Sequence, residues 1–262
     1  MRYQELYEEM TGGRGGEALR GWAGRVLRDI ASGASPVAGV RHPLGFLCLP
    51  LERTGEYGVC LHIWSGALPR AASTTSQIHC HSWDLVSHVL YGRVENVRAD
   101  VGDAGGGAGD DAGDGAAGAT GGIPGHAGEA TGGNGGTPGH AGEATGGGGG
   151  TTVPPGATHR VFEVVSDAGG DRVLPTPRTV RCAPGVSEVY GPGETYTLPA
   201  GVFHSSVVPG GETATIALGH GRPGRSDLSL GPLGLGAHLV PRHRCDARET
   251  ARAALHAAGR LS

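Results

Sequence analysis

The sequence predicts a mainly β protein, a sandwich or barrel, with a helix near each end of the chain. Three observations carry this prediction. Short apolar segments separated by turn residues recur from Leu44 to Gly219, a pattern typical of closed all-β folds. Amphipathic patterns of helical spacing lie on either side of that region. A glycine-rich segment, Val101 to Gly156, interrupts it.

A helix is predicted near the N-terminus, in residues 17–31. Its large apolar side chains fall on one face at helical spacing, while the arginines point elsewhere. Gly33 and Pro36 are expected to end the helix. Residues 1–43 are therefore assigned to an N-terminal helical extension. The apolar face comprises Leu19, Trp22, Val26, Leu27 and Ile30.

Residues 44–240 are assigned to a β barrel. The segments "LGFLCLPLE" and "VCLHIWSG" flank a glycine-containing turn and predict a hairpin. Many short strands with regular turns between them are typical of a sandwich or barrel. The segment "LGPLGLGAHLVPRH" is left unassigned. Further strands are expected at 76–81, 84–90, 93–99, 159–166, 178–183, 187–190, 194–198, 203–208 and 212–219.

The insertion at 101–156 is predicted to be a disordered loop. It holds much of the chain's 52 glycines and contains "PGHAGEATGG" twice, at 124–133 and 138–147. Gly, Ala, Asp and Thr bury too little apolar area to offset the ~1 to 2 kcal/mol per residue that ordering a backbone costs. His126 and His140 recur in this repeat. Replication slippage in a tolerated loop explains them better than a metal-collecting role.

A second helix is predicted at the C-terminal end, within residues 241–262. Asp246 and Glu249, three residues apart, form a capping-box pattern, and Gly259 is expected to stop the helix.

Composition narrows the class of partner. The net charge of -4 is small and the charges are scattered, so we do not expect the protein to bind nucleic acid or a membrane surface. A small-molecule substrate is expected instead. The start, "MRYQELYEEM", does not resemble a signal peptide, and no run approaches the ~18 apolar residues of a membrane span. We expect a cytoplasmic monomer or homodimer. The five widely spaced cysteines include no C-x-x-C pair, which argues against a disulfide framework or a structural zinc site.

The stretch "QIHCHSWDLVSHVLYG" places two histidines on one face of a strand. Successive strand side chains point to opposite faces, so His79 and His81 point the same way while Cys80 points the other. Two imidazoles at this spacing suit a divalent metal. Cys80 is interpreted as a packing residue.

A second stretch, "GETYTLPAGVFH", supplies a third histidine. Pro199 and Gly201 form a tight turn that delivers His204 into the next strand. This spacing resembles the second motif of the cupin superfamily. The H-x-H, followed eleven residues later by Gly92, resembles the first motif.

The cupin resemblance covers about residues 44–99 and 159–219. It implies a double-stranded β-helix, a jelly-roll barrel in which His79, His81 and His204 bind a metal at the open end. Where many cupins have a glutamate ligand, this chain has Leu85. Asp84 would turn inward only if the strand carried a one-residue bulge. A site of three histidines alone is favoured, and three histidines with Asp84 is the alternative.

A three-histidine cupin site resembles that of the thiol dioxygenases, the cysteine dioxygenase group. The resemblance implies a non-heme iron(II)-dependent dioxygenase that acts on a small polar metabolite, such as the thiol cysteine or a derivative, with dioxygen as second substrate. Iron(II) is the expected metal, with manganese, nickel or zinc as alternatives. Two other functions stay open: a metal-dependent isomerase, lyase or epimerase, and a non-catalytic cupin that binds a small ligand.

Two further residues are candidates for catalysis. His62 shares a strand face with Cys60 and Trp64 and would contact substrate or a metal ligand if that face lines the barrel interior. Tyr196 lies in the strand before His204 and could donate its hydroxyl to dioxygen at the metal. Packing is the ordinary role of either side chain in a strand.

Overall fold

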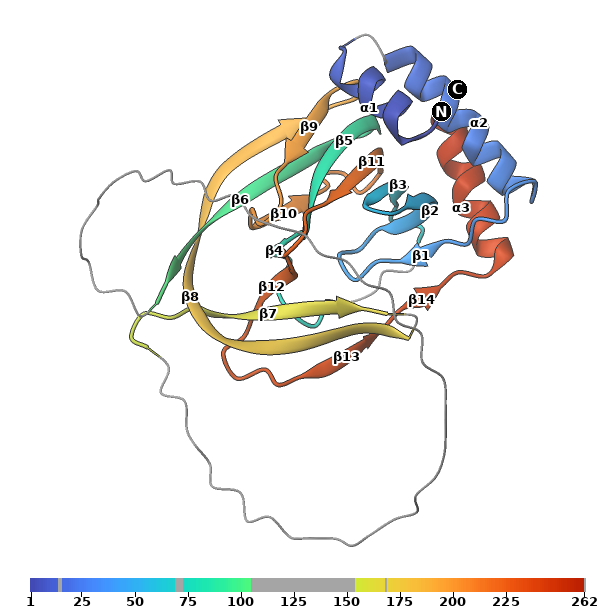
Figure 1. Cartoon of the computed structure of the whole chain (residues 1–262). Coiled ribbons are helices and arrows are strands. Elements are labelled where there is room, and N and C mark those ends of the chain that lie inside the picture. Colours follow the sequence, from blue (N-terminus) through green and yellow to red (C-terminus); the bar gives the residue numbers. More distant parts are fainter. Residues whose placement is uncertain (14–15, 69–72, 105–153, 168, 262) are drawn as a thin grey trace, which may run out of the picture. The chain divides into compact units, whose positions relative to one another are not determined.

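The computed structural model describes residues 1–262 except 14–15, 69–72, 105–153, 168 and 262. The described chain is mainly β, with two antiparallel sheets and helices near both ends (Figure 1). This confirms the coarse fold class that the sequence predicts. Among the described residues, no helix combines the length and apolar character needed to cross a membrane.

The first sheet is built around the predicted hairpin, whose two strands join at a turn containing Gly55 in the left-handed region (φ 59°). Its outer strands come from distant parts of the chain. The order across the sheet is β14 (His243–Arg244), β1 (Val40–Arg41), β2 (Leu47–Thr54), β3 (Tyr57–Trp64), β11 (Thr213–Gly221), β5 (Trp83–Tyr91) and β9 (Thr195–Leu198).

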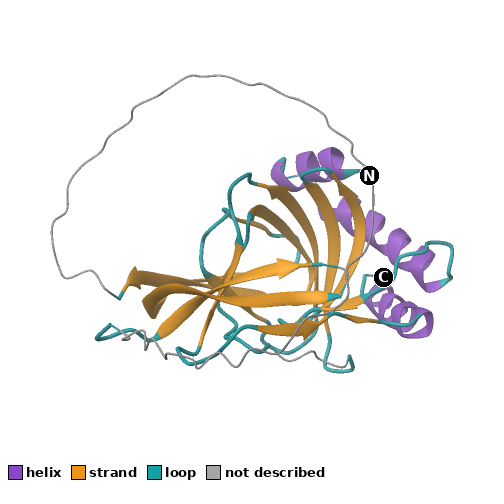
Figure 2. Cartoon of the chain, turned by 60° about the horizontal axis from the view of Figure 1, so that its bottom comes forward, coloured by secondary structure: helices purple, strands orange, loops and turns teal. Residues whose placement is uncertain are grey.

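Three helices pack with one face of this sheet into the largest apolar core (Figure 2). They are α1 (Tyr3–Thr11), α2 (Gly16–Ala31) and α3 (Ala247–Gly259). Leu19, Trp22, Leu27 and Ile30 of the predicted helix face are buried against Leu61, Ile216 and Leu218 of the sheet. The sheet face turned away from the helices is therefore free to line an interior.

The second sheet has the order β13 (His238–Pro241), β8 (Gly170–Tyr190), β6 (Val94–Asp103), β10 (His204–Val207), β4 (His79–Cys80), β12 (Asp227–Gly231) and β7 (His159–Ser166). An additional pairing of β7 with β8 closes six of these strands into a ring. Val94 of this sheet packs with Leu85, Val89 and Leu198 of the first sheet. The two sheets therefore share an interior at this point.

The long strand β8 corrects two predictions. The strands expected at 178–183 and 187–190 are parts of one 21-residue strand. Val180, at its middle, pairs with Asp103 on one side and with His159 on the other. Because β6 runs to Asp103, the predicted loop begins too early, and most of it lies outside the described residues.

Several short elements were not predicted from the sequence. They are α1, β1, β12, β13 and β14, and β13 and β14 fall in or beside the unassigned segment "LGPLGLGAHLVPRH". The edge strands among them contain few residues each, so no periodicity develops within them. The C-terminal helix was predicted closely: Asp246 accepts a hydrogen bond from the Glu249 backbone N–H at 2.7 Å, and the helix runs to Gly259.

Candidate metal centre

Three imidazoles from two distant parts of the chain meet on the second sheet. His79 of β4 pairs directly with His204 of β10, and His81 follows one residue after β4. The ring centroids lie 4.5 Å apart for His79 and His204, 4.8 Å for His79 and His81, and 5.2 Å for His81 and His204. One nitrogen from each ring lies within 4.8 Å of the others, close enough for the group to hold one metal ion.

The predicted turn before His204 fixes the third ligand. Gly201 adopts a left-handed conformation (φ 85°), and the Val202 N–H bonds the Pro199 carbonyl at 3.2 Å. The Gly201 N–H donates to the His81 carbonyl at 2.9 Å. The turn thereby ties the backbone of one ligand residue to the loop that carries another.

Hydrogen bonds to the backbone set which ring nitrogen is free. The Nδ1–H of His79 donates to the Gln77 carbonyl at 2.9 Å, and that of His204 donates to the Val202 carbonyl at 3.0 Å. A carbonyl only accepts, so each Nδ1 carries the proton. The Nε2 lone pairs are left to bind a cation, the arrangement usual for metal-bound histidines.

Burial keeps the three rings neutral. It lowers the pKa of His79 to about 3, with a smaller effect of the neighbouring His204. The pKa of His81 falls well below its ordinary value because of burial, then because of His79 and His204. Burial likewise lowers the pKa of His204. At neutral pH the group therefore presents three uncharged nitrogen donors, the form that binds metal.

Asp84 is engaged elsewhere. Its carboxylate accepts hydrogen bonds from the Arg222 guanidinium and from the Ala200 N–H, the latter at 2.8 Å. Arg222 lowers the pKa of this carboxyl below its ordinary value. The next residue, Leu85, packs in the interior instead. Asp84 therefore lies outside the group of potential ligands that the three histidines form.

His62 lies on the inner face of β3, as the sequence analysis considered. Its ring is 4.4 Å from that of Phe46 and 5.9 Å from that of Trp64. It forms a second group of potential ligands with Cys48 and Cys60, whose ligand atoms all lie within 4.8 Å of one another. The Cys48 thiol and His62 lower the pKa of the Cys60 thiol to about 5.

Tyr196 is buried, only 6% exposed, in an apolar cluster between the sheets. Its ring stacks on Tyr190 with centroids 4.7 Å apart. Burial raises the pKa of its hydroxyl, which also interacts with the side chains of Ser87 and Asn96. Those surroundings are polar only at the hydroxyl, where Asn96 also accepts a hydrogen bond at 2.8 Å from the hydroxyl of Ser206, two residues after His204 on β10.

Cys80 faces away from the ligands, as predicted. It is 2% exposed and packs with Val161, Phe203 and Leu230.

Sequence reasoning missed His42. Its ring stacks on Phe46 with centroids 4.3 Å apart, and its Nδ1 accepts a hydrogen bond from the Leu44 N–H at 3.3 Å. Burial lowers the pKa of His42 to about 3, assisted by His62 and His79. Its chain position, before the first predicted strand, gave no signal of this placement.

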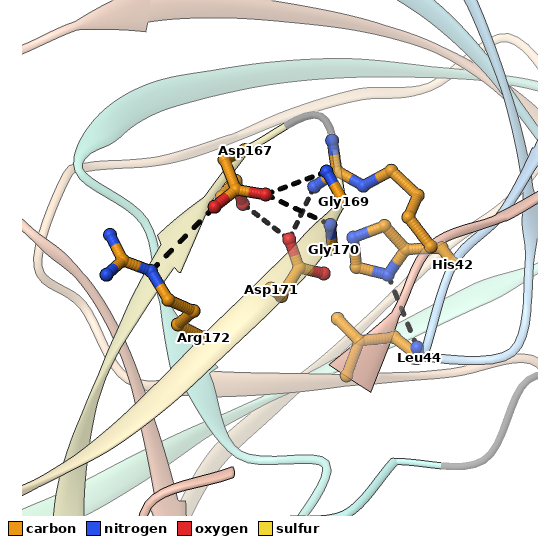
Figure 3. A network of polar contacts seen from close by, with 9 residues as sticks. His42, Leu44, Asp167, Gly169, Gly170, Asp171 and Arg172 are labelled. Carbon is orange, nitrogen blue, oxygen red and sulfur yellow. Dashed lines mark hydrogen bonds and ion pairs between the residues drawn. The ribbon is translucent and has the colours of Figure 1, made fainter. Parts of the chain in front are cut away.

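A carboxylate network lies close to His42 in the fold. Asp171 of β8 accepts hydrogen bonds from the Ser166 hydroxyl at 2.7 Å and from Arg242 at 2.5 Å. Figure 3 shows Asp167 and Asp171 in this network, together with His42 and its bond from Leu44. Arg242 also contributes to the low pKa of His42. The positive charge of Arg242 therefore acts on the buried His42 ring as well as on the carboxylate of Asp171.

No protein-family model matches the chain, and no curated protein is detectably similar to it. Its function is therefore argued from the residues themselves.

Proposed function

We propose that this protein is a non-heme iron(II)-dependent dioxygenase of cupin type whose substrate is a small polar thiol, such as cysteine or a derivative. The single observation that carries the proposal is the meeting of His79, His81 and His204, each neutral and without a carboxylate in the group. Neutral ligands leave the charge of a divalent cation uncompensated. An anionic thiolate or carboxylate of the substrate would then be drawn to the same centre.

The arrangement of the chain supports the cupin part of the proposal. Two antiparallel sheets share an interior, and the two motifs bring their histidines onto adjacent strands. Gly92 and Gly201, at the glycine positions of those motifs, both adopt left-handed conformations that other residues rarely take.

The donor set fits iron(II). Imidazole nitrogens bind iron, zinc, copper and nickel well, and three of them on one side of a cation leave the opposite side open. When bound there, iron(II) would supply the redox chemistry that lets a thiol react with dioxygen, a reaction that is slow without a metal.

The chain's own residues would hold and orient the reactants. His79 and His204 are each fixed by a backbone carbonyl, so their free nitrogens are aimed before a metal arrives. Trp83 stacks on His81 at 4.1 Å and restricts that ring. His62, on the inner face of β3, acts electrostatically on His81. Tyr196 would act by positioning, through Ser87 and Asn96.

The proposed reaction is balanced without another reductant. One thiol and one dioxygen give one sulfinic acid. The O–O and S–H bonds break, the sulfur keeps its bond to carbon, forms two bonds to oxygen and gives up four electrons to dioxygen, and the thiol proton ends on an oxygen of the sulfinic acid. Oxygen uptake should therefore match thiol loss one to one.

The test is oxygen consumption by the iron(II)-loaded protein with a panel of small thiols. We expect uptake with at least one thiol, and a loss of more than about a hundredfold in His204→Asn, which removes one ligand nitrogen. The Cys182→Ser variant, altered away from the site, serves as control. Iron(II)-loaded protein that consumes no oxygen with any thiol would contradict the proposal.

A second function is compatible with the same ligands. Three neutral imidazoles also suit zinc, manganese or nickel acting only as a Lewis acid, as in an isomerase, lyase or epimerase. Turnover of a substrate with one of these metals under anaerobic conditions would support this alternative. Metal and ligand binding without turnover in either assay would indicate a non-catalytic ligand-binding protein.

A further inference from the structure

A second group of metal-binding side chains lies on the hairpin of β2 and β3. Cys48 lies directly opposite His62, and Cys60 lies two residues before His62 on the same strand. The two sulfurs and one imidazole nitrogen all lie within 4.8 Å of one another. This group shares no residue with the three histidines described above.

A β-bulge creates this group. The register of β2 and β3 shifts between Pro50 and Glu52, so Leu51 has no partner on β3. If the register of Glu52 with Val59 continued without a bulge, Leu51 would pair with Cys60, and Cys48 would lie opposite Ile63 and point into the core beneath the helices. With it, Cys48 turns to the same face as Cys60 and His62. The bulge therefore places Cys48 next to Cys60 and His62.

The pair of sulfurs is poorly placed for a disulfide. Cys48 and Cys60 occupy diagonal positions across an antiparallel pair, where Cα atoms are about 7 to 8 Å apart. The Cα atoms of a disulfide are usually about 4.4 to 6.8 Å apart, and both thiols are free in the structure. A bridging ion spans such a gap more readily than a bond between the two sulfurs.

The surroundings favour a soft cation over a hard one. Two thiols with one imidazole are the ligands that select zinc or copper(I), whereas magnesium and calcium prefer oxygen. All three residues are partly buried, and the rings of Phe46 and Trp64 lie beside His62.

We propose that Cys48, Cys60 and His62 form a second metal site, which binds a soft ion of the zinc(II) or copper(I) class through two sulfurs and one nitrogen. The spacing of the cysteines does not indicate this site, since they are twelve positions apart and belong to no recognised zinc spacing. This inference does not depend on the proposed dioxygenase activity. His62 would then serve the second site rather than the substrate.

Titration of the full-length, reduced, metal-free protein with cobalt(II) tests the proposal. We expect two equivalents to bind, one of which produces thiolate-to-cobalt charge-transfer absorption in the near ultraviolet. Zinc(II) should displace the cobalt from that site and remove the absorption. Cobalt serves as the probe because zinc itself absorbs no light there.

Variants separate the two sites. Cys60→Ser and Cys48→Ser should each abolish the charge-transfer band and lose one equivalent, while the second equivalent is retained. His79→Asn should lose the other equivalent and retain the band. Cys182→Ser, a cysteine outside the group, is the matched control and should retain both. Each cysteine variant should still bind one equivalent of cobalt at the three histidines, and this binding would also show that the variant has folded.

Three results would overturn the inference. One is the absence of a thiolate-to-cobalt charge-transfer band from the wild-type protein titrated with cobalt(II). Another is a charge-transfer band that survives in both cysteine variants. The third is quantitative formation of a Cys48–Cys60 disulfide in air with no metal bound, because the sulfurs would then act as a redox pair. None of these results involves oxygen uptake, so they can be told apart from failure of the proposed activity.

Discussion

At the scale of single residues, the candidate metal centre depends on where each polar atom finds its partner. His79 and His204 use Nδ1 on a carbonyl two residues earlier, and this leaves Nε2 free. Asp84 has both carboxylate oxygens occupied, by Arg222 and by the Ala200 N–H. The residues next to Asp84 in the sequence do not predict this ion pair, because Arg222 is 138 residues away in the chain.

Asp84→Asn distinguishes the two ligand sets that the sequence left open. We expect the same number of bound metal equivalents and the same affinity as in the wild type, because the carboxylate binds Arg222. Metal content and titration calorimetry measure both quantities, with His204→Asn as the variant that loses binding. A clear loss of affinity in Asp84→Asn would place this carboxylate at the metal.

His42 predicts how the stability of the metal-free protein depends on pH. Its pKa is lowered to about 3 in the folded state, so the unfolded chain takes up a proton below pH 6.5 that the folded chain cannot. The free energy of unfolding should therefore fall as the pH drops from 6.5, by up to about 1.4 kcal/mol per pH unit for this residue.

Urea unfolding of wild type and His42→Phe, in the presence of a chelator, checks this expectation. The variant keeps a ring against Phe46 and lacks the titrating group. The stability of the wild type relative to the variant should decrease by up to about 2 kcal/mol between pH 7 and pH 5. A difference that does not change with pH would show that His42 accepts a proton in the folded protein.

At the scale of elements, turns and bulges decide which side chains face the interior. The bulge at Leu51 places Cys48 beside His62. The turn that contains Gly201 positions His204, and Gly92 ends the strand that follows the first two ligands. The sequence predicted the turn at Pro199 and Gly201, and it gave Gly92 only as a motif position; both glycines adopt the positive φ that glycine takes most readily. A bulge has no comparable signature, so the hairpin register could not be predicted.

Gly92→Ala tests the turn after β5. Gly92 has a φ of 79°, and a Cβ there would lie 2.2 Å from the Glu212 carbonyl oxygen. We expect a loss of about 3 kcal/mol or more in unfolding free energy, since overlap adds to the roughly 1 to 2 kcal/mol of a left-handed alanine.

Gly193→Ala is the matched control for this prediction. Gly193 has a φ of 86°, and nothing lies within 4 Å of its Cβ position. It should lose only the conformational part, about 1 to 2 kcal/mol. Urea unfolding measures both variants, and equal losses would show that the contact with Glu212 does not constrain the turn.

At the scale of the whole molecule, the sheets are closed by segments far apart in the chain. The ends of β6 and β7 flank the same residue of β8, because Asp103 and His159 both pair with Val180. Two neighbouring strand spacings separate these ends, about 10 Å in all. The chain between them could therefore be much shorter without disturbing the pairing.

Replacing residues 105–153 with a short glycine and serine linker should leave metal binding and the unfolding midpoint close to those of the full chain. The deletion removes His126 and His140 and leaves His79, His81 and His204 in place. Metal titration and thermal unfolding of the shortened protein check this. A loss of metal equivalents on deletion, with the midpoint unchanged, would show that the insertion supplies ligands.

The sequence by itself determined the mainly β class, the two long helices and the three histidines that converge. The β class and the helices follow from local periodicity and from capping residues, which act over a few residues, whereas the convergence of the histidines was expected from the resemblance of two motifs to the cupin pattern. Only the tertiary structure decided that β8 is one strand paired on both sides, that Asp84 binds Arg222, and that Cys48 joins Cys60 and His62. Each of these depends on register between segments distant in sequence, and register is set by packing of the whole sheet.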